Sequence, residues 1–371
     1  MDLSELVRKD FLEVGPDAKI SEVASHMIRG EEAVVVCDEN FIGIISSNQL
    51  IDRDYPAETK TRTLVRKNIP RIEDDIGSAG VAKLFLENNV KAVPVFSKDK
   101  LAGLLYEKDF IRNSECLSDT KKTLEDIASV PDVIEKDESI GKARTVLKEK
   151  NISRLPVVDE RGKLSGIIDI EDFLKTVNPR EGMGRKDSAG DSVPEFKLPV
   201  TTIMDENPLV TEENITCSKI IKLFKKHNKS YIIMVRNKEP VGIVTSKDIL
   251  ELMASLESQK GVYVQINGLG ETEDEFEKDK IDSMIIDSVQ KIGKIHGPME
   301  YFFVHIKSSQ REGEQKLFSI RTRALTPVGL YVSKASGWNV ITTTDEALDR
   351  LERQIIEDRE KKMNLRSPRN A

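Results

Sequence analysis

The sequence predicts an α/β (α+β) fold in which four similar repeats precede a smaller C-terminal domain of different design. The chain has 371 residues, which is more than one hydrophobic core usually organises. A Gly-led apolar triplet returns four times before residue 256, each time after a β-branched run. From Gly261 onward the order of apolar runs and helical patterns changes. We therefore expect several domains, most of them built from one repeated unit.

Each repeat is predicted to form strand, helix, strand, strand and helix. A helical apolar pattern, as in residues 139–150, precedes a short β-branched run that is typical of a buried strand. The second strand of each pair is the Gly-led triplet, which enters a polar helix start. The β-branched runs are residues 33–36, 92–95, 155–158 and 231–235, and the triplets begin at Gly43, Gly103, Gly166 and Gly242.

This order resembles the CBS domain over roughly the first 256 residues. The resemblance rests on the apolar-Pro-Val pieces, such as Leu155-Pro156-Val157, and on the Gly-led triplet before an acidic helix start. CBS repeats pair into modules, so the resemblance implies one CBS pair over residues 1–115 and another over 120–256. Residues 178–199 are rich in Gly, Pro, Ser and mixed charge and are predicted to be a flexible insert. A homodimer through the CBS modules is also implied.

The resemblance further implies a nucleotide site. In CBS domains that bind adenosine nucleotides, Ser or Thr follows the triplet and Asp stands three positions later. Such an Asp accepts hydrogen bonds from ribose hydroxyls, and the hydroxyl faces a phosphate. Only the fourth repeat has both residues, Thr245 and Asp248, and Arg154 of the third repeat is placed to neutralise the phosphate. Asp172 and Asp109 keep the ribose acceptor in repeats three and two. No cofactor is obligatory, and AMP, ADP or ATP is the expected regulatory ligand.

Each of these residues has a second interpretation that needs no ligand. A Thr followed three positions later by an acidic residue is also a helix-capping pattern, which suits Thr245 and Asp248. In repeat one, Ser46 and Gln49 have the form of a capping box. For Arg154 the alternative is a surface ion pair.

The C-terminal domain, expected over residues 261–362, is predicted to contain a strand (262–269), a helix (273–294), three strands and a final helix (344–362). The run Asp349-Arg350-Leu351-Glu352-Arg353-Gln354 lies in a final helix that is similar to that of bacterial ribosome hibernation-promoting factors. The resemblance covers about 100 residues and implies binding to ribosomal subunits. Residues 363–371 are predicted to be a flexible basic tail.

Alternation predicts that Phe302, Val304 and Ile306 face the helices of this domain. The opposite, open face would combine aromatic and basic side chains, which stack on RNA bases and pair with phosphates. The alternatives are that this face docks on the CBS modules and that the basic end of the helix is only solvated. The expected ribosome or RNA contacts are Tyr301, Phe303, His305, Lys307, Lys316, Arg321, Arg323, Lys361 and Lys362.

Composition excludes several classes of function. The net charge of −7 argues against a general nucleic-acid binder, so any phosphate contact must be local. Three separated Cys indicate neither a disulfide framework nor a zinc site, and we expect no metal. No signal peptide or membrane span is predicted, which favours a cytoplasmic protein without a membrane partner. The four His lie in no catalytic constellation, so no enzyme is expected.

These observations predict a translation regulator that binds ribosomal subunits and keeps them inactive, as in ribosome hibernation under stress. The CBS modules would tune it through adenosine nucleotides. The alternative is a nucleotide-sensing regulatory subunit of an enzyme, in which the C-terminal domain is a protein-docking module.

Overall fold

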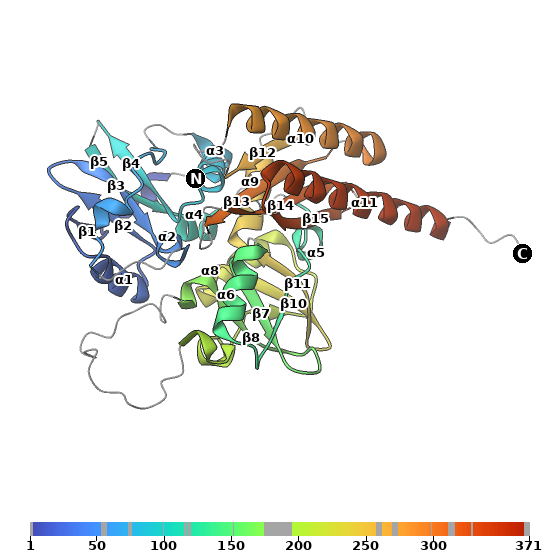
Figure 1. Ribbon diagram of the computed structural model, residues 1–371, viewed down its shortest axis with the longest axis horizontal. Coiled ribbons are helices and arrows are strands. Elements are labelled where there is room, and N and C mark those ends of the chain that lie inside the picture. Colours follow the sequence, from blue (N-terminus) through green and yellow to red (C-terminus); the bar gives the residue numbers. More distant parts are fainter. Residues whose placement is uncertain are drawn as a thin grey trace, which may run out of the picture. The chain divides into compact units, whose positions relative to one another are not determined.

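Two compact units make up the computed structural model, in which the described residues are 3–52, 58–72, 76–98, 100–114, 117, 120–150, 152–173, 195–256, 262–268, 274–297, 299–310, 316–327 and 329–366 (Figure 1). The first unit, here called the repeat unit, comprises residues 1–124, 130–147 and 153–254. The second, here called the tail unit, comprises residues 125–129, 148–152 and 255–371. Of the predicted insert at 178–199, residues 178–194 lie outside the described part.

The first repeat follows the predicted order of elements, and in the described part of the second the leading strand is reduced to a single bridge between Ile72 and Val95. Repeat one contains a helix before the β-branched strand and its Gly-led partner, and repeat two repeats this arrangement. The elements are η1 (Leu3–Glu5), β1 (Glu13–Val14), α1 (Ile20–Ile28), β2 (Ala33–Cys37), β3 (Phe41–Ser46), α2 (Ser47–Asp52), η2 (Thr61–Thr63), α3 (Gly77–Asn88), β4 (Ala92–Ser97), β5 (Lys100–Tyr106) and α4 (Glu107–Arg112).

Repeats three and four have the same order, except that a short 3-10 helix replaces the α-helix after the third Gly-led strand. The elements are α5 (Leu124–Ile127), β6 (Ile134–Glu135), α6 (Ile140–Glu149), β7 (Arg154–Val158), β8 (Leu164–Asp169), η3 (Ile170–Phe173), η4 (Glu195–Lys197), η5 (Val200–Thr202), β9 (Val210–Thr211), α8 (Cys217–His227), β10 (Tyr231–Arg236), β11 (Glu239–Thr245) and α9 (Ser246–Ser255). The predicted fold class is confirmed.

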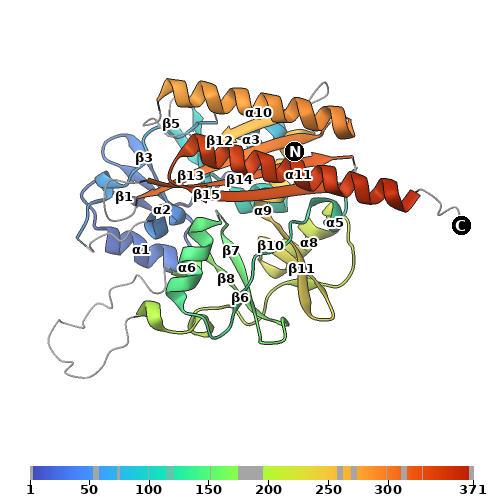
Figure 2. The same cartoon turned by 45° about the vertical axis from the view of Figure 1, so that its right-hand side comes forward.

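Each β-branched strand pairs antiparallel with the Gly-led strand that follows it, as β2 does with β3 and β10 with β11. In repeats one, three and four a two-residue strand adds parallel to the β-branched strand, giving the orders β1-β2-β3, β6-β7-β8 and β11-β10-β9. Figure 2 shows the small sheets of repeats three and four beside one another. The buried β-branched runs therefore form the centre of each repeat.

The repeats are joined in pairs by an exchange of leading segments. The segment that precedes one repeat forms two backbone hydrogen bonds with the Gly-led strand of its partner. These contacts join Arg8 to Leu104, Arg66 to Ile44 and Asp205 to Ile167, at 2.8–3.2 Å between N and O. At Gly103 an added Cβ would overlap the carbonyl oxygen of Arg8, and Gly43 and Gly166 meet similar obstacles. The recurring glycine is thus required because a neighbouring backbone lies against it.

Apolar side chains of both partners then form shared cores. Ala33, Val35 and Ile44 of repeat one pack with Ala92 and Leu104 of repeat two. A second cluster joins repeat three to repeat four in the same way. Its members are Ile167, Tyr231, Ile233, Val235 and Ile243. Each pair of repeats is therefore one folding core, because the shared cluster buries apolar surface from both.

The tail unit contains a four-stranded sheet in the order β12-β13-β14-β15, with α10 and α11 against one face (Figure 1). β12 pairs parallel with β13, and the other neighbours are antiparallel. The elements are β12 (Tyr263–Asn267), α10 (Glu275–His296), β13 (Tyr301–Gln310), β14 (Lys316–Thr326), β15 (Gly329–Gly337) and α11 (Val340–Arg366). The final helix is longer than predicted and includes residues 363–366 of the expected flexible tail.

The core of the tail unit lies between this sheet and the two helices. Phe302, Val304 and Ile306 pack there with Ile281 of α10 and Leu351 of α11. The predicted alternation of β13 is therefore confirmed for its helix-facing side. Among the described helices, none is long and apolar enough to cross a membrane.

The close approach at the glycines predicts a position-specific loss of stability. We expect Gly103→Ala to destabilise the repeat unit by about 1–3 kcal/mol, because the obstructing atom belongs to backbone that cannot rotate away. Gly15→Ala is the control, since a Cβ there meets nothing within 4 Å. Denaturant unfolding of the two variants measures the difference. Equal losses in both would contradict the close-approach explanation.

Candidate functional site

The four Gly-led strands run directly into helix starts, and in three of them a side chain caps the first turn. The backbone N–H of the last strand residue donates to the side chain three positions later. The pairs are Ser46 with Gln49 (2.8 Å), Asp169 with Asp172 (2.8 Å) and Thr245 with Asp248 (2.5 Å). The capping alternative is therefore present in repeats one, three and four.

The predicted nucleotide residues of repeat four satisfy each other. The Thr245 hydroxyl also donates to Asp248 Oδ2 at 2.7 Å, and Asp248 is only 2% exposed. Both donors contact Asp248 Oδ2, so a ribose would have to displace them or reach the other carboxylate oxygen. The role of Thr245 and Asp248 as nucleotide ligands stays a prediction.

In repeat two the corresponding carboxylate is held by a different residue. Arg8 donates to both oxygens of Asp109, at 2.6 and 3.0 Å. Its guanidinium also lies 4.8 Å from the centre of the Tyr106 ring. The backbone contact between Arg8 and Leu104 places this arginine, so the segment exchange itself fills the ribose-acceptor position of repeat two. The hydrogen bond to Asp109 raises the pKa of Arg8.

Arg154 lies in a buried ion pair rather than on the surface. Its Nε is 2.8 Å from Asp169 Oδ2, and its Nη2 donates to Ser230 Oγ at 2.6 Å. Burial disfavours the charged guanidinium, but nearby carboxylates outweigh this effect and raise the pKa of Arg154. Arg154 also lines one cavity with Ser246 and Lys247 of repeat four, and its contact with a phosphate stays a prediction. That cavity measures only about 70 Å³, well below the size of usual ligand pockets.

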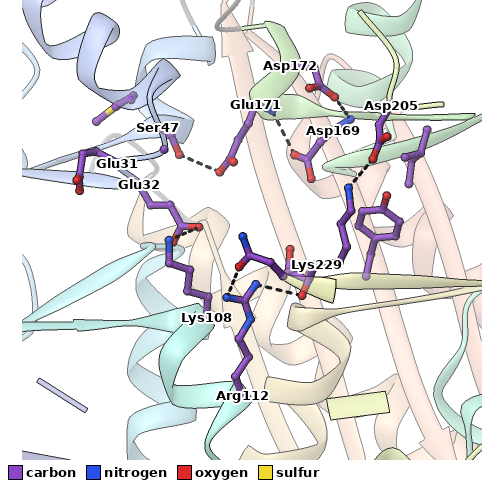
Figure 3. A pocket seen from close by; sticks show the side chains of 16 residues that line it. Glu31, Glu32, Ser47, Lys108, Arg112, Asp169, Glu171, Asp172, Asp205 and Lys229 are labelled. Carbon is purple, nitrogen blue, oxygen red and sulfur yellow. Dashed lines mark hydrogen bonds and ion pairs between the residues drawn. The ribbon is translucent and has the colours of Figure 1, made fainter. Parts of the chain in front are cut away.

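A larger cavity of about 300 Å³ lies where all four repeats meet in the repeat unit (Figure 3). Repeat three contributes Asp169, Glu171 and Asp172, and a 3-10 helix start brings these carboxylates to the cavity. The other repeats contribute residues from helix starts and from the segments before their strands. These are Met27, Gly30, Glu31, Glu32, Ser47, Lys108, Arg112, Asp205, Asn228, Lys229, Ser230 and Tyr231, and Ile167 of repeat three completes the lining.

Three cations of this cavity are held by partners from other parts of the unit, as Figure 3 shows. Lys108 of repeat two pairs with Glu32 of repeat one at 3.3 Å. Lys229 pairs with Asp205 at 2.5 Å and lowers the pKa of that carboxyl against the effect of burial. The third cation, Arg112, has neutral partners, the side-chain oxygen of Asn228 (2.7 Å) and the carbonyl of Lys229 (3.3 Å). The cations can therefore reach a ligand only by exchanging these contacts.

Glu171 is a cavity carboxylate with a raised pKa. Burial raises its pKa, and the charge of Asp169 raises it further, while Lys91 and Arg154 act in the opposite direction. Its Oε1 accepts a hydrogen bond from Ser47 Oγ at 3.2 Å, which joins repeat three to repeat one. Protonation of Glu171 would therefore relieve repulsion without breaking the contact between the repeats.

The sequence analysis missed the three cations of the larger cavity. It selected Arg154 because a cation stands directly before the apolar run Leu155-Pro156-Val157, whereas Lys229 lies two positions before the strand of repeat four. Lys108 stands between Glu107 and Asp109 at the start of the second Gly-led helix. A positive charge between two acidic residues is a signal that could have identified it from the sequence. No described group of three or more His, Cys, Asp or Glu is arranged to hold a metal ion.

In the tail unit the aromatic side chains of β13 form a row on the side opposite the core. The ring centres of Tyr301 and Phe303 are 4.8 Å apart, and Phe303 stacks on His305 at 6.0 Å. Arg323 lies opposite Phe303 in the sheet register, and Arg321 lies opposite His305. Tyr301, Phe303, His305 and Arg323 are buried in this structure. Their contact with RNA stays a prediction.

The remaining basic residues of the prediction do not all lie on one side of the sheet. Lys307 and Arg321 are half-buried on the aromatic side. Lys316 lies on the same side of β14 as the core residues Phe318 and Ile320, because alternate residues of a strand face the same way. It therefore lies on the helix side of the sheet, and the prediction that it lies on the aromatic side was wrong. Lys361 and Lys362 belong to α11, but their side chains lie outside the described residues.

The raised pKa of Glu171 predicts how stability depends on pH. The folded state binds this proton more readily than the unfolded state, so the free energy of unfolding falls as pH rises above about 4.3, the ordinary Glu pKa, through the raised value. Glu171→Gln keeps an acceptor for Ser47 and should raise the thermal midpoint at pH 7 to 8, with a smaller gain near pH 4. Glu31→Gln controls for the loss of one cavity charge. A Glu171→Gln variant that melts below the native protein at pH 7 would refute this assignment.

Comparison with known proteins identifies both parts of the chain. The CBS domain family model matches residues 3–55, 62–115, 124–178 and 200–255, which together are more than half of the chain. The model described as "Hibernation factor Hib, C-terminal domain" matches residues 263–371. Both are regulatory domains and not catalytic ones. The predicted recognition of a four-repeat CBS protein with a hibernation-factor-like C-terminus is confirmed.

Relatives and solved structures agree with this division. The protein MJ1404 of Methanocaldococcus jannaschii is 28% identical over 90% of this chain and 80% of its own. A 33.4 kDa protein in the ribosomal RNA operon of Thermofilum pendens is 26% identical over 50% of this chain and 60% of its own. The crystal structure of MJ1225 from M. jannaschii has the same fold over 68% of this chain and all of its own, with a TM-score of 0.56 and 20% identity. The chain belongs to the CBS domain family and carries a C-terminal domain like that of the hibernation factor Hib.

Proposed function

We propose that this protein is a cytoplasmic translation regulator that binds ribosomal subunits and holds them inactive under stress, and that it is not an enzyme. The match of residues 263–371 to the hibernation-factor domain carries the proposal. A relative that covers half of the chain is named for its place in a ribosomal RNA operon, which also supports it. The CBS repeats act as the sensor and as the surface through which two copies associate.

The sensing ligand contains adenosine and occupies the cavity of about 300 Å³. This volume is at the lower limit of small-molecule sites, whereas the cavity beside Ser246 and Lys247 is about a quarter as large. Asp172 would accept from the ribose hydroxyls in place of the Asp169 N–H, and Lys108, Arg112 and Lys229 would turn toward the phosphate. The four-repeat lining supports a sensor, because one ligand would contact every repeat.

The charges of this cavity favour a ligand with few phosphate groups. Six carboxylates line it against three cations, all of them labelled in Figure 3. Each added phosphate charge therefore meets net negative surroundings, and AMP should bind more tightly than ADP or ATP. A ligand that binds one arrangement of the repeats better than another shifts the protein toward it, in proportion to that difference in affinity.

The ribosome proposal predicts co-sedimentation of the full chain with ribosomal subunits on a gradient. If Lys307 and Arg321 contact RNA phosphates, the Lys307→Ala, Arg321→Ala variant should bind more weakly, and the salt dependence of log affinity should fall by about one unit for each lost contact. Lys291→Ala is the matched control, because Lys291 lies on α10 and pairs with Glu352 of α11.

Absence of co-sedimentation in every salt and nucleotide condition would overturn the ribosome proposal. It would favour the alternative, a regulatory subunit of an enzyme. Equal weakening by the control variant would place the contact outside the aromatic side of the sheet.

The ligand proposal predicts a difference between two lysines at the same position of their repeats. Lys108 lines the larger cavity, and Lys247 lines the smaller one. Lys108→Met should weaken AMP binding by about ten- to a hundredfold, the value of a hydrogen bond to a charged group, and Lys247→Met should not. Thermal melts over AMP, ADP and ATP measure this, because a ligand of the folded state raises the melting temperature.

The reverse result has a definite meaning. If Lys247→Met or Asp248→Asn abolishes the nucleotide shift while Lys108→Met retains it, the site is at repeat four. If no adenosine nucleotide at millimolar concentration shifts the melt of the native chain, the CBS unit is not an adenosine sensor.

A further inference from the structure

A third cavity of the repeat unit, of about 410 Å³, lies between the end of α4 and one face of α8. The residues from α8 recur at helical spacing, so they form a single row along the helix. The α4 end contributes its last residue and the segment after it. The lining residues are Arg112, Asn113, Ser114, Leu117, Ser218, Ile221, Lys222 and Lys225. The cavity therefore joins repeat two to repeat four, away from the Gly-led helix starts.

Among the described residues, the charged lining of this cavity is entirely positive. Its three charged side chains are all cations, and no described lining residue is acidic. Arg112 donates to neutral oxygens of Asn228 and Lys229, and Lys225 donates to the side-chain oxygen of Asn113 at 2.8 Å. Within the described part of the chain no carboxylate forms an ion pair with Lys222. Lys222 and Lys225 are exposed, so solvent screens much of the repulsion among the three cations, and an anion between them would remove the rest.

This charge contrasts with the rest of the molecule. The chain as a whole has a net charge of −7, and the cavity of about 300 Å³ has twice as many carboxylates as cations. The floor of the third cavity is apolar, because Leu117 is fully buried and Ile221 is 6% exposed. The hydroxyl of Ser218 lines the cavity and can donate to an oxyanion, and that of Ser114, which donates to Met253 Sδ at 3.6 Å, could exchange this weak contact for one. Such a lining suits a ligand with several negative oxygens.

We propose that this cavity binds a small molecule that carries two or three linked phosphate groups. The cations of Arg112, Lys222 and Lys225 neutralise the phosphates, and the serine hydroxyls donate to the remaining oxygens. A single phosphate would leave part of the cationic charge uncompensated, and the volume admits a longer chain. Because the site spans repeats two and four, its ligand stabilises the arrangement of the two CBS pairs.

Arg112 lines both this cavity and the cavity of about 300 Å³ proposed for adenosine. A polyphosphate that draws the guanidinium toward Lys222 weakens its contacts with Asn228 and Lys229, which are part of the cavity proposed for adenosine. Occupation of the two cavities is therefore coupled, and the coupling acts equally in both directions. This coupling, unlike the anion site itself, rests on the proposed adenosine site.

Binding of sodium tripolyphosphate to the full chain tests the anion site, with titration calorimetry as the measurement. The probe contains no nucleoside, so it does not report on the adenosine site. Lys222→Ala and Lys225→Ala should each weaken binding by about tenfold or more. Lys226→Ala is the matched control, because Lys226 lies on the same helix, is exposed and does not line the cavity.

Three results would overturn the anion site. The first is no binding at millimolar tripolyphosphate. The second is equal weakening by Lys226→Ala, which would show only general attraction to a basic helix. The third is loss of ribosome co-sedimentation in the Lys222→Ala, Lys225→Ala variant without any tripolyphosphate binding by the native chain, which would assign the cations to RNA.

The coupling has its own measurement. The affinity for AMP should change when tripolyphosphate saturates the third cavity, and the affinity for tripolyphosphate should change by the same factor when AMP is saturating. Unchanged affinities would refute the coupling through Arg112. Normal tripolyphosphate binding by Lys108→Met would distinguish a failed adenosine site from a failed anion site.

Discussion

The close approach of a leading segment to the Gly-led strand of the partner repeat is the constraint on which the repeat unit depends. Gly103 and Gly43 leave room for the backbones of Arg8 and Arg66, so strand edges are hydrogen-bonded across the pair. A buried strand edge without these partners would leave unpaired N–H and C=O groups. The exchange therefore explains both the recurring glycine and why CBS repeats fold as pairs.

The same constraint decides which helix starts are available to ligands. It places Arg8 on Asp109, and so fills the acceptor position of repeat two. It also brings Asp205 beside β8, where the carboxylate pairs with Lys229 in the lining of the cavity of about 300 Å³. The capping contacts hold the other acceptors, including Asp248. Ligand binding in this unit is consequently an exchange of existing contacts, which suits a sensor whose response depends on small differences in affinity.

Sequence reasoning found the helix starts but not the cavity. It identified Asp172 and Arg154, which line cavities, because each lies at a fixed place in its own repeat. It gave preference to Thr245 and Asp248 on their residue types, although the same pair forms a cap. It missed Lys108 and the row along α8, because those side chains acquire meaning only when residues from different repeats come together.

The sequence by itself determined the four repeats, the change of design after residue 256, and the alternation that places Phe302 and Ile306 in the tail core. These follow from local periodicity and from glycine, which act within a few residues along the chain. Only the tertiary structure decided that Arg154 pairs with Asp169 and that Arg112 lies between two cavities. The contact of Arg112 with Asn228 joins segments more than a hundred residues apart, and no local pattern records such a distance.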